Sequence, residues 1–295
     1  MNKESWKLID LLTTASDFLA EKEIEYPRRN AEALLGKALA MPRIELYLQH
    51  DRPLRQHEIN RFREMVKRRI NREPLQQILG EVEFLGCHLL TPRGLLVPRP
   101  ETELLAVQAV KLSQERFGDE ETIRILDLGC GTGCLGIALA SALPTASVDA
   151  VDIDPLAIET TEKNAKLNGV DARLNPIQSD MLEENFIERL SPPYNVVVSN
   201  PPYVRVSEFD SLAPEIRHFE NPEALIGGEN GLKFYRRIAR ILPTLLIDNG
   251  FAALELGSGQ AEAVSTLMVE QGMKASVEQD LNGVERMLIA LRQSE

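Results

Sequence analysis

Hydrophobic residues recur at helical spacing through the first seventy residues of the chain. One face of a helix within residues 3–21 is outlined by Leu8, Leu11, Leu12, Ala15, Phe18 and Leu19. Residues 26–41 predict a second helix with Pro27 in its first turn, residues 42–49 a short third one, and residues 55–73 a long basic one. The N-terminal part is therefore expected to be a small helical bundle.

The pattern changes between residues 75 and 90, where it becomes strand-like around Gly80 and Glu81. This change predicts a β-hairpin that connects two parts of the chain. A proline-rich passage at residues 91–103 follows and leads into a helix that starts near Glu101. We therefore predict a helical domain at 1–73, a hairpin and proline-rich linker at 74–98, and a larger domain at 99–295.

The second part of the chain alternates between strand-like and helix-like segments. Strands are predicted at 123–128, 147–151, 173–178, 195–199, 250–256, 274–279 and 285–291. Helices are predicted at 133–142, 155–168, 232–247 and 258–271. This alternation predicts an α/β fold with a doubly wound, mainly parallel sheet that binds ligands at the carboxyl ends of its strands. A hairpin-type turn separates the last two strands, so the final one is expected to be antiparallel.

The composition is that of an ordinary globular protein, with 43% hydrophobic and 26% charged residues. No apolar run approaches the roughly 18 residues of a membrane span, and the N-terminus lacks a secretion signal. Cys87, Cys130 and Cys134 have no zinc or disulfide spacing, which indicates a reducing cytoplasm. A redox pair of Cys130 and Cys134 is much less favoured than two small packing residues. No metal site is expected, because the histidines are scattered at His50, His57, His88 and His218.

The formal net charge of −12 is unevenly distributed. Residues 1–93 hold 16 Lys and Arg against 14 Asp and Glu, whereas residues 94–295 hold 17 against 31. An acidic second part is a poor electrostatic match to duplex nucleic acid. Residues 52–73 carry seven Arg and one Lys against three Glu, a suitable surface for an acidic protein partner. For any single arginine, a solvated helix face is the simpler interpretation.

A glycine-rich turn lies between a predicted strand and helix in "RILDLGCGTGCLGIALA", residues 124–140. Gly129, Gly131 and Gly133 allow a sharp bend and a close approach to a ligand. The same glycines also fit a dinucleotide fingerprint, so they do not decide the ligand by themselves. Asp127 favours another cofactor, because its carboxylate would repel a pyrophosphate but suits an ammonium group. S-adenosylmethionine has such a group and no phosphate.

Two further acids follow the next two predicted strands. Asp152 lies 19 residues after Gly133, where an acid typically accepts hydrogen bonds from ribose hydroxyls. Asp154 precedes a proline and is predicted to be a helix N-cap. Asp180 could accept a hydrogen bond from the adenine amine, with Met181 as an apolar wall. A helix or turn cap is an equally supported interpretation of Asp180.

The fourth predicted strand of the second part ends abruptly in "VVVSNPPYV", residues 196–204. Pro201 and Pro202 cannot donate to a sheet ladder, so strand pairing stops there. Doubly wound order places the first and fourth strands side by side. Asn200 and Tyr203 are therefore expected to face the methyl group of a cofactor held at the glycine turn.

A planar amide or ring-bound amino group is a poor nucleophile, because its lone pair is delocalised. The side-chain oxygen of Asn200 and the carbonyl of Pro201 could accept both of its hydrogens and orient it toward a methylsulfonium. Tyr203 offers a π-face that tolerates developing positive charge. The alternative is a mere strand terminator with a buried tyrosine, which the upstream glycine turn and acid disfavour.

The chain resembles the release-factor glutamine methyltransferases, which modify the glutamine of the Gly-Gly-Gln loop in peptide-chain release factors. The combination of a "PRPETE" stretch with "NPPY" is the most specific part of this resemblance. The stretches that carry it are "VPRPETE" (97–103), "DLGCGTG" (127–133), "AVDIDPLAI" (150–158), "QSDM" (178–181), "VSNPPY" (198–203) and "ALELG" (253–257). The resemblance implies a Rossmann-like class I S-adenosylmethionine-dependent methyltransferase sheet, preceded by a helical bundle and a β-hairpin linker.

The resemblance also implies roles for particular residues. The substrate amide would be held by Asn200, Pro201, Pro202 and Tyr203. S-adenosylmethionine, and its product S-adenosylhomocysteine, would be bound by the glycine turn, the acids considered above, Met181 and Asn200. The full set of expected cofactor-binding residues is Asp127, Gly129, Cys130, Gly131, Thr132, Gly133, Asp152, Asp180, Met181 and Asn200. In "PRPETE", Arg99, Glu101 and Glu103 either order the linker over the pocket or cap the following helix.

The helical N-terminal part would, on this resemblance, dock the release factor. The expected protein is a cytoplasmic monomer that methylates the N5 amide nitrogen of the glutamine, without direct binding to nucleic acid or membrane. One alternative is a nucleic-acid methyltransferase acting on an exocyclic adenine or guanine amine, which would need base flipping and a target-reading surface. Another is a dinucleotide-dependent enzyme or a non-catalytic binding module, against which Asp127 and the Asn200 motif argue.

Overall fold

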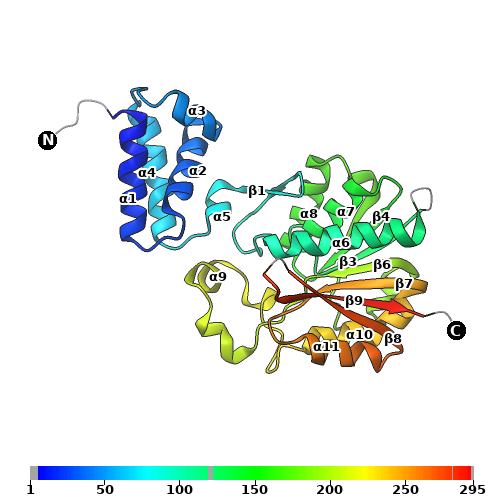
Figure 1. Ribbon diagram of the computed structural model, residues 1–295. Coiled ribbons are helices and arrows are strands. Elements are labelled where there is room, and N and C mark those ends of the chain that lie inside the picture. Colours follow the sequence, from blue (N-terminus) through cyan, green and yellow to red (C-terminus); the bar gives the residue numbers. More distant parts are fainter. Residues whose placement is uncertain (1–5, 119–121, 281, 294–295) are drawn as a thin grey trace. The chain divides into compact units, whose positions relative to one another are not determined.

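The computed structural model describes residues 6–118, 122–280 and 282–293 (Figure 1). The chain divides into two compact units. The first, here called the helical unit, contains the chain up to Gly80 together with Ala213–Phe219. The second, here called the sheet unit, contains Glu81–Leu212 and the chain from Glu220 onward. The segment Ala213–Phe219, although distant in sequence, thus belongs to the helical unit.

The helical unit contains all four helices that the hydrophobic pattern predicts. Its core forms where their apolar faces meet, and it includes Leu12, Leu35 and Phe62. The residues predicted to form the apolar face of the first helix are buried, except for Phe18, which is 38% exposed. The helices of this unit are α1 (Leu8–Glu21), α2 (Pro27–Leu39), α3 (Arg43–Leu48), α4 (Gln56–Ile70), α5 (Leu75–Leu79) and α9 (Pro214–Phe219).

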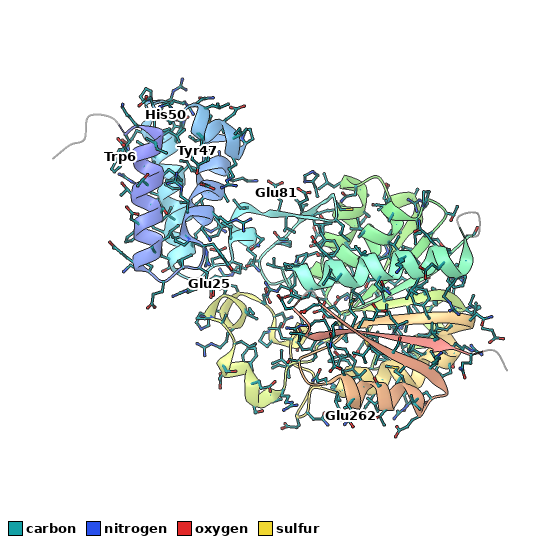
Figure 2. All side chains as sticks on the ribbon, in the orientation of Figure 1. Trp6, Glu25, Tyr47, His50, Glu81 and Glu262 are labelled. Carbon is teal, nitrogen blue, oxygen red and sulfur yellow. The ribbon has the colours of Figure 1, made fainter. Side chains whose placement is uncertain are left out.

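A buried carboxylate links α2 to α3 inside the helical unit. Glu32 accepts hydrogen bonds from Arg28 Nε at 3.1 Å, from Arg43 Nε at 2.6 Å and from the hydroxyl of Tyr47, which Figure 2 labels. Burial by itself would raise the pKa of Glu32, but these three donors outweigh it and the pKa is lowered. The helices are therefore joined by a charged network as well as by apolar packing.

The predicted hairpin lies within the predicted range of residues 75–90, but the first part of that range is helical. Residues 75–79 form helix α5, and Gly80 is its left-handed C-cap with φ 80°. The hairpin pairs β1 (Glu81–Phe84) with β2 (Cys87–Leu90), and its turn lies at Leu85 and Gly86 with φ 49° and 78°. Residues with a left-handed backbone conformation occur both at the C-caps of helices and in tight hairpin turns. A glycine in the sequence therefore does not show by itself which of these two structures is present.

The sheet unit contains a seven-stranded sheet in the order β5-β4-β3-β6-β7-β9-β8. Strand β9 is antiparallel to both of its neighbours, and the other pairs are parallel. This arrangement confirms the predicted doubly wound, mainly parallel sheet with an antiparallel final strand. The strands are β3 (Arg124–Leu128), β4 (Ser147–Asp152), β5 (Leu174–Gln178), β6 (Tyr194–Ser199), β7 (Leu246–Glu255), β8 (Met273–Gln279) and β9 (Glu285–Arg292).

Helices cover both faces of this sheet, so successive residues of the central strands enter different cores. In β6, Val196 and Val198 belong to one apolar cluster and Val197 to the other. The α-helices of the unit are α6 (Pro100–Phe117), α7 (Cys134–Ala142), α8 (Pro155–Leu167), α10 (Lys233–Leu245) and α11 (Ala261–Val269). Short 3₁₀ helices lie at Asp171–Arg173, Phe186–Arg189, Val206–Ser211 and Pro222–Ala224. Across the described residues, every helix is too short or too polar to traverse a bilayer.

Strands β3 and β6 are direct neighbours at the centre of the sheet. Their register pairs Leu128 with Ser199, the last residue of each strand. Gly129 and Asn200, which follow these residues, therefore leave the same edge of the sheet side by side. The order of the strands thus confirms the predicted proximity of the glycine turn and Asn200.

Candidate active site

The glycine turn after β3 adopts a conformation that side chains would strain. Gly129, Gly131 and Gly133 have φ of 73°, 56° and 79°. A Cβ on Gly133 would also lie 2.9 Å from side-chain atoms of Thr161. The turn is anchored to the neighbouring strand, because the amides of Gly129 and Cys130 both donate to the carbonyl of Val151. Glycine is therefore required here by backbone geometry and by close packing.

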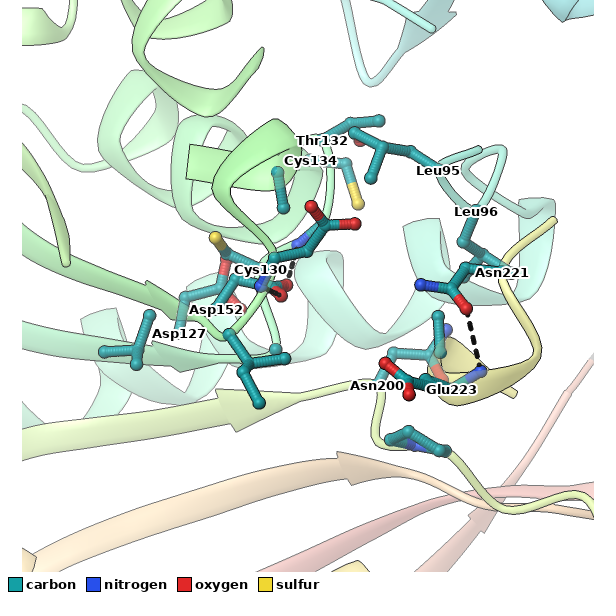
Figure 3. A pocket seen from close by; sticks show the side chains of 18 of the residues that line it. Leu95, Leu96, Asp127, Cys130, Thr132, Cys134, Asp152, Asn200, Asn221 and Glu223 are labelled. Carbon is teal, nitrogen blue, oxygen red and sulfur yellow. Dashed lines mark hydrogen bonds between the residues drawn. The ribbon is translucent and has the colours of Figure 1, made fainter. Parts of the chain in front are cut away.

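A cavity of about 350 Å³ opens at the carboxyl ends of the central strands (Figure 3). Asp127, Cys130 and Asp152 lie on the side of the glycine turn, and Asn200, Asn221 and Glu223 lie across from them. Of the predicted cofactor residues, Gly133 is not among those that line the cavity. Those that do line it are Asp127, Gly129, Cys130, Gly131, Thr132, Asp152, Asp180, Met181 and Asn200.

Asp127 presents an unsatisfied carboxylate oxygen to this cavity. The residue is 1% exposed, and its Oδ2 accepts a hydrogen bond from the amide of Gly136 at 2.9 Å. Its Oδ1 is buried and has no hydrogen-bond partner among the described residues. Burial raises the pKa of Asp127 to about 7, opposed by the Gly136 hydrogen bond and reinforced by the charge of Asp152. An unpaired buried acceptor is costly, so this oxygen suits a ligand that brings a cationic donor.

Asp152 is held in a fixed orientation at the end of β4. Its Oδ2 accepts from the amide of Gly131 and its Oδ1 from the amide of Asp154, both at 2.9 Å. Each oxygen retains a second acceptor position for a pair of neighbouring hydroxyl groups. Asp154 accepts from the amide of Leu156 at 2.8 Å, which confirms the predicted N-cap of α8.

Asp180 and Met181 form another part of the cavity wall. Asp180 Oδ1 accepts a hydrogen bond from the amide of Leu182 at 2.8 Å, so the residue caps a turn and also lines the cavity. Its second oxygen makes no hydrogen bond with the described residues. Met181 is 8% exposed and lines the cavity, and its contact with an adenine ring stays a prediction. Both interpretations of Asp180 are compatible with this geometry.

The four residues of the "NPPY" stretch occupy different positions. Asn200 and Pro202 line the cavity, whereas Pro201 and Tyr203 are not among its lining residues. Tyr203 is partly buried against the core around β7 and α10, and its carbonyl accepts from Gln260 Nε2 at 3.0 Å. Burial raises its pKa to about 12. A direct contact between the Tyr203 ring and a substrate stays a prediction.

The "PRPETE" stretch is attached to this region by two of its side chains. Arg99 Nη2 pairs with the buried Glu220 at 2.6 Å, and Glu220 also accepts from the amide of Val97 at 3.4 Å. Thr102 accepts a hydrogen bond from Asn200 Nδ2 at 3.2 Å. Glu101 and Glu103 lie in the first turn of α6, where acidic residues interact favourably with the helix dipole. Arg99 therefore orders the linker against the segment that follows the "NPPY" stretch.

Several lining residues were missed by the sequence analysis. They come from two loops, where no periodicity marks a buried side, and from the starts of helices α6 and α10. The "PRPETE" stretch indicated the first loop without assigning a role to Thr102, and nothing indicated the second. The missed lining residues include Gly94, Leu95, Leu96, Pro98, Thr102, Asn221, Glu223, Ala224 and Phe234.

The two cysteines of the glycine turn are not reactive thiols. Burial raises the pKa of Cys130 well above its usual value and that of Cys134 to about 12. Both side chains therefore stay protonated near neutral pH, which favours the packing role over a redox pair. Among residues 6–118, 122–280 and 282–293, no three His, Cys, Asp or Glu side chains are grouped so that they could hold a metal ion.

Comparison with known proteins gives two kinds of match. Residues 10–80 match the family model of the PrmC N-terminal domain, and residues 108–216 match that of the methyltransferase small domain. The release factor glutamine methyltransferase of Chlorobaculum tepidum is 36% identical over 289 residues, covering 98% of each chain. That of Geobacter sulfurreducens is 36% identical over 286 residues, covering 97% of this chain and 96% of the relative.

One solved structure supports the fold. The delta-N METTL16 methyltransferase domain matches with a TM-score of 0.52 at 18% sequence identity. The match covers 72% of this chain and 91% of that domain. At this level of identity it shows the architecture of the sheet unit and nothing about its substrate.

Proposed function

This chain belongs to the release factor glutamine methyltransferase family and is a protein-glutamine methyltransferase, and we propose that methyl transfer takes place in the cavity lined by Asp127, Asp152 and Asn200. The proposed donor is S-adenosylmethionine, which leaves as S-adenosylhomocysteine. The proposed acceptor is the N5 amide nitrogen of the glutamine in the Gly-Gly-Gln loop of a release factor. One observation carries this proposal: Asp127, whose Oδ1 has no hydrogen-bond partner among the described residues, and Asn200 line the same cavity.

The residues around the glycine turn fit S-adenosylmethionine. Asp127 Oδ1 would accept a hydrogen bond from its ammonium group, and the two oxygens of Asp152 would accept from its ribose hydroxyls. Met181 would pack against the adenine, and Asp180 would accept from its amine. The carboxyl group of Asp127, which lines the cavity beside the glycine turn, disfavours a pyrophosphate-containing dinucleotide, because its ionised form would repel the phosphates. When bound, S-adenosylmethionine supplies an electrophilic methyl group on a sulfonium, so no nucleophilic side chain is needed.

Asn200 and Pro201 would orient the substrate amide. The Asn200 side-chain oxygen makes no hydrogen bond with the described residues, so it is available to accept one hydrogen of the glutamine amide. The Pro201 carbonyl would accept the other, and Pro202 limits the freedom of that carbonyl. These two oxygens would stabilise the positive charge that develops on the amide nitrogen as it bonds to the methyl carbon and the carbon–sulfur bond breaks, and the proton would then pass to solvent water.

The helical unit would bind the release factor. Of the eight cations in residues 52–73, five pair with acidic side chains of the same unit: Arg52, Lys67, Arg68, Arg69 and Arg72. Arg55, Arg61 and Arg63 are exposed and make no ion pair with the described residues. These three arginines are the basic surface that we propose for an acidic partner.

We also propose that the protein acts as a monomer. Because the proposed substrate belongs to the translation machinery, we infer that the reaction takes place in the cytoplasm. The inferred location depends on the assignment of the substrate, whereas the monomeric state does not. Neither inference alters the expected chemistry at Asn200.

Mass spectrometry of a release factor incubated with the protein and S-adenosylmethionine tests the proposal. We expect one added methyl group on the glutamine of the Gly-Gly-Gln loop, and none when that glutamine is replaced. Ribosomal RNA and duplex DNA are incubated in parallel with labelled cofactor. Methyl incorporation into nucleic acid, with none in the release factor, would overturn the assignment in favour of base methylation.

A further inference from the structure

We propose that Thr102 is a positioning residue, which orients the Asn200 amide so that its oxygen faces the substrate. This inference rests on the proposed function and extends it to the "PRPETE" stretch. Thr102 lies in the first turn of α6, nearly one hundred residues before Asn200 in the sequence. The two side chains meet only in the folded protein.

Three side chains form a continuous hydrogen-bonded chain behind the cavity. Asn200 Nδ2 donates to Thr102 Oγ1 at 3.2 Å, and the Thr102 hydroxyl donates to Glu255 Oε2 at 2.6 Å. Thr102 and Glu255 are only 2% and 3% exposed. Glu255 reaches this position because it ends β7, which runs parallel to β6 with Leu254 opposite Ser199. The carboxyl ends of two neighbouring strands and the start of a helix thus supply the three groups.

The direction of these hydrogen bonds follows from the number of protons available. A threonine hydroxyl has one hydrogen, and an ionised carboxylate can only accept. Burial raises the pKa of Glu255, and the hydrogen bond from Thr102 and the charges of Arg286 and Arg99 oppose this rise without cancelling it. The direction therefore rests on geometry: the Thr102 hydroxyl donates to Glu255 Oε2 at 2.6 Å. With its hydrogen committed to Glu255, Thr102 can only accept from Asn200.

This direction leaves one orientation for the Asn200 amide. Its NH₂ group must point at Thr102, so its oxygen is directed away from Thr102 and is free for the glutamine amide. The opposite orientation would place two acceptors 3.2 Å apart and would point an NH₂ group at the NH₂ group of the substrate. Thr102 therefore excludes the orientation that cannot accept a substrate hydrogen.

The test compares Thr102→Val, which keeps the shape of the side chain but lacks a hydroxyl, with Thr102→Ser, which restores the hydroxyl. We expect Thr102→Val to lower kcat for release-factor methylation roughly tenfold to hundredfold, because the acceptor is misoriented. Thr102→Ser should restore most of that loss. The Kd of S-adenosylhomocysteine, measured by calorimetry, should change by less than about threefold, since cofactor contacts are retained.

A double-mutant cycle separates positioning from a structural role. If Thr102 acts through Asn200, then Thr102→Val should have no further effect on kcat when Asn200 is already alanine. An equal loss in the presence and absence of the Asn200 side chain would overturn the proposal, as would full activity of Thr102→Val. If the valine variant does not fold, Thr102→Ala is carried through the same cycle.

The same assays distinguish this inference from the proposed function. Wild-type protein is assayed in each series on the same release factor. If it does not methylate the glutamine, the function is wrong. If it does, and the cycle is additive, only the role of Thr102 is wrong.

Discussion

Asn200 is a polar residue that follows a strand of buried residues, and its proposed role is to bind the substrate amide. Its amide faces the cavity from the end of β6, and its oxygen is uncommitted within the described part of the chain. Replacing it leaves the strand and the glycine turn in place. Removal of the Asn200 side chain is therefore expected to affect the orientation of the substrate amide specifically.

We predict that Asn200→Ala lowers kcat by about 10²–10³, the usual effect of removing one preorganised polar contact to a developing charge. The Kd of S-adenosylhomocysteine should barely change, because Asp127 and Asp152 are untouched. Steady-state kinetics and calorimetry on the same preparation measure both quantities. A large loss of cofactor affinity with little change in kcat would instead assign Asn200 to the cofactor site.

Asp127 links cofactor binding to pH. Burial raises its pKa from the usual 3.8 to about 7, so in the free protein the carboxyl is largely protonated below that pH. A cationic ammonium group binds the ionised carboxylate. Affinity for S-adenosylhomocysteine should therefore be constant well above pH 7 and fall by up to about tenfold per unit as the pH drops below it.

Calorimetry between pH 5.5 and 8.5 measures this dependence, and comparison of buffers with different ionisation enthalpies detects the released proton. Asp127→Asn is the control, since it cannot titrate and should show weaker, flatter binding across the range. A pH profile that is the same in wild type and Asp127→Asn would show that this carboxyl does not contact the ammonium group.

At the scale of elements, helix α9 is paired with two arginines of the helical unit, the buried Arg69 and, at 3.5 Å from Glu215, Arg72. Arg69 of α4 donates to Asn30 Oδ1 at 2.8 Å, to the carbonyl of Glu73 at 3.2 Å and to Glu215 of α9 at 3.1 Å. Burial opposes ionisation of Glu215, but hydrogen bonds from its own amide and from Arg69 outweigh it and lower its pKa. The short segment Ala213–Phe219 is thus held in the helical unit by charge.

We predict that Arg69→Met reduces the free energy of unfolding of the helical unit by about 2–4 kcal/mol, because it leaves buried partners unpaired. Hydrogen exchange of the full chain should show loss of protection in residues 213–219 and in α2. Amides of β3 in the sheet unit should be unaffected. Arg240→Met, an exposed position in α10, should change stability by less than about 0.5 kcal/mol. Unchanged protection at 213–219 would contradict the role of Arg69.

At the scale of the whole molecule, charge is divided between a slightly basic helical part and an acidic remainder. Most cations of residues 52–73 are used within the helical unit, which leaves Arg55, Arg61 and Arg63 exposed. A protein substrate with acidic groups would be attracted to this surface. Such an attraction contributes to association with the substrate and leaves the chemical step unchanged.

We predict that Arg61→Glu raises KM for the intact release factor about three- to tenfold and leaves kcat unchanged, as expected for an exposed interfacial charge. The difference from wild type should shrink as salt increases, because exposed charges are screened. Lys274→Glu, an equivalent charge reversal at an exposed position of the sheet unit, is the control. If both charge reversals raise KM equally, then the change in net charge explains the effect, and a docking surface at Arg61 does not.

Much of the sheet could be predicted because its strands are short hydrophobic runs between helices of clear periodicity. Strands β3 to β9 all occur within one residue of their predicted bounds, except that β7 begins at Leu246, four residues earlier than predicted. The hairpin range wrongly included the helical residues 75–79, because Gly80 and Gly86 both have positive φ and local sequence does not say which ends a helix and which forms a turn. Loop residues such as Asn221 were missed because a loop has no period from which burial can be inferred.

The sequence by itself determined the elements, the doubly wound order and the residue types at the strand ends, because hydrophobic periodicity and chain connectivity restrict these strongly. Only the tertiary structure decided that Thr102, Asn200 and Glu255 form one hydrogen-bonded chain and that Glu215 pairs with Arg69. Contacts between residues a hundred positions apart depend on how elements pack in three dimensions. No local preference of the chain encodes them.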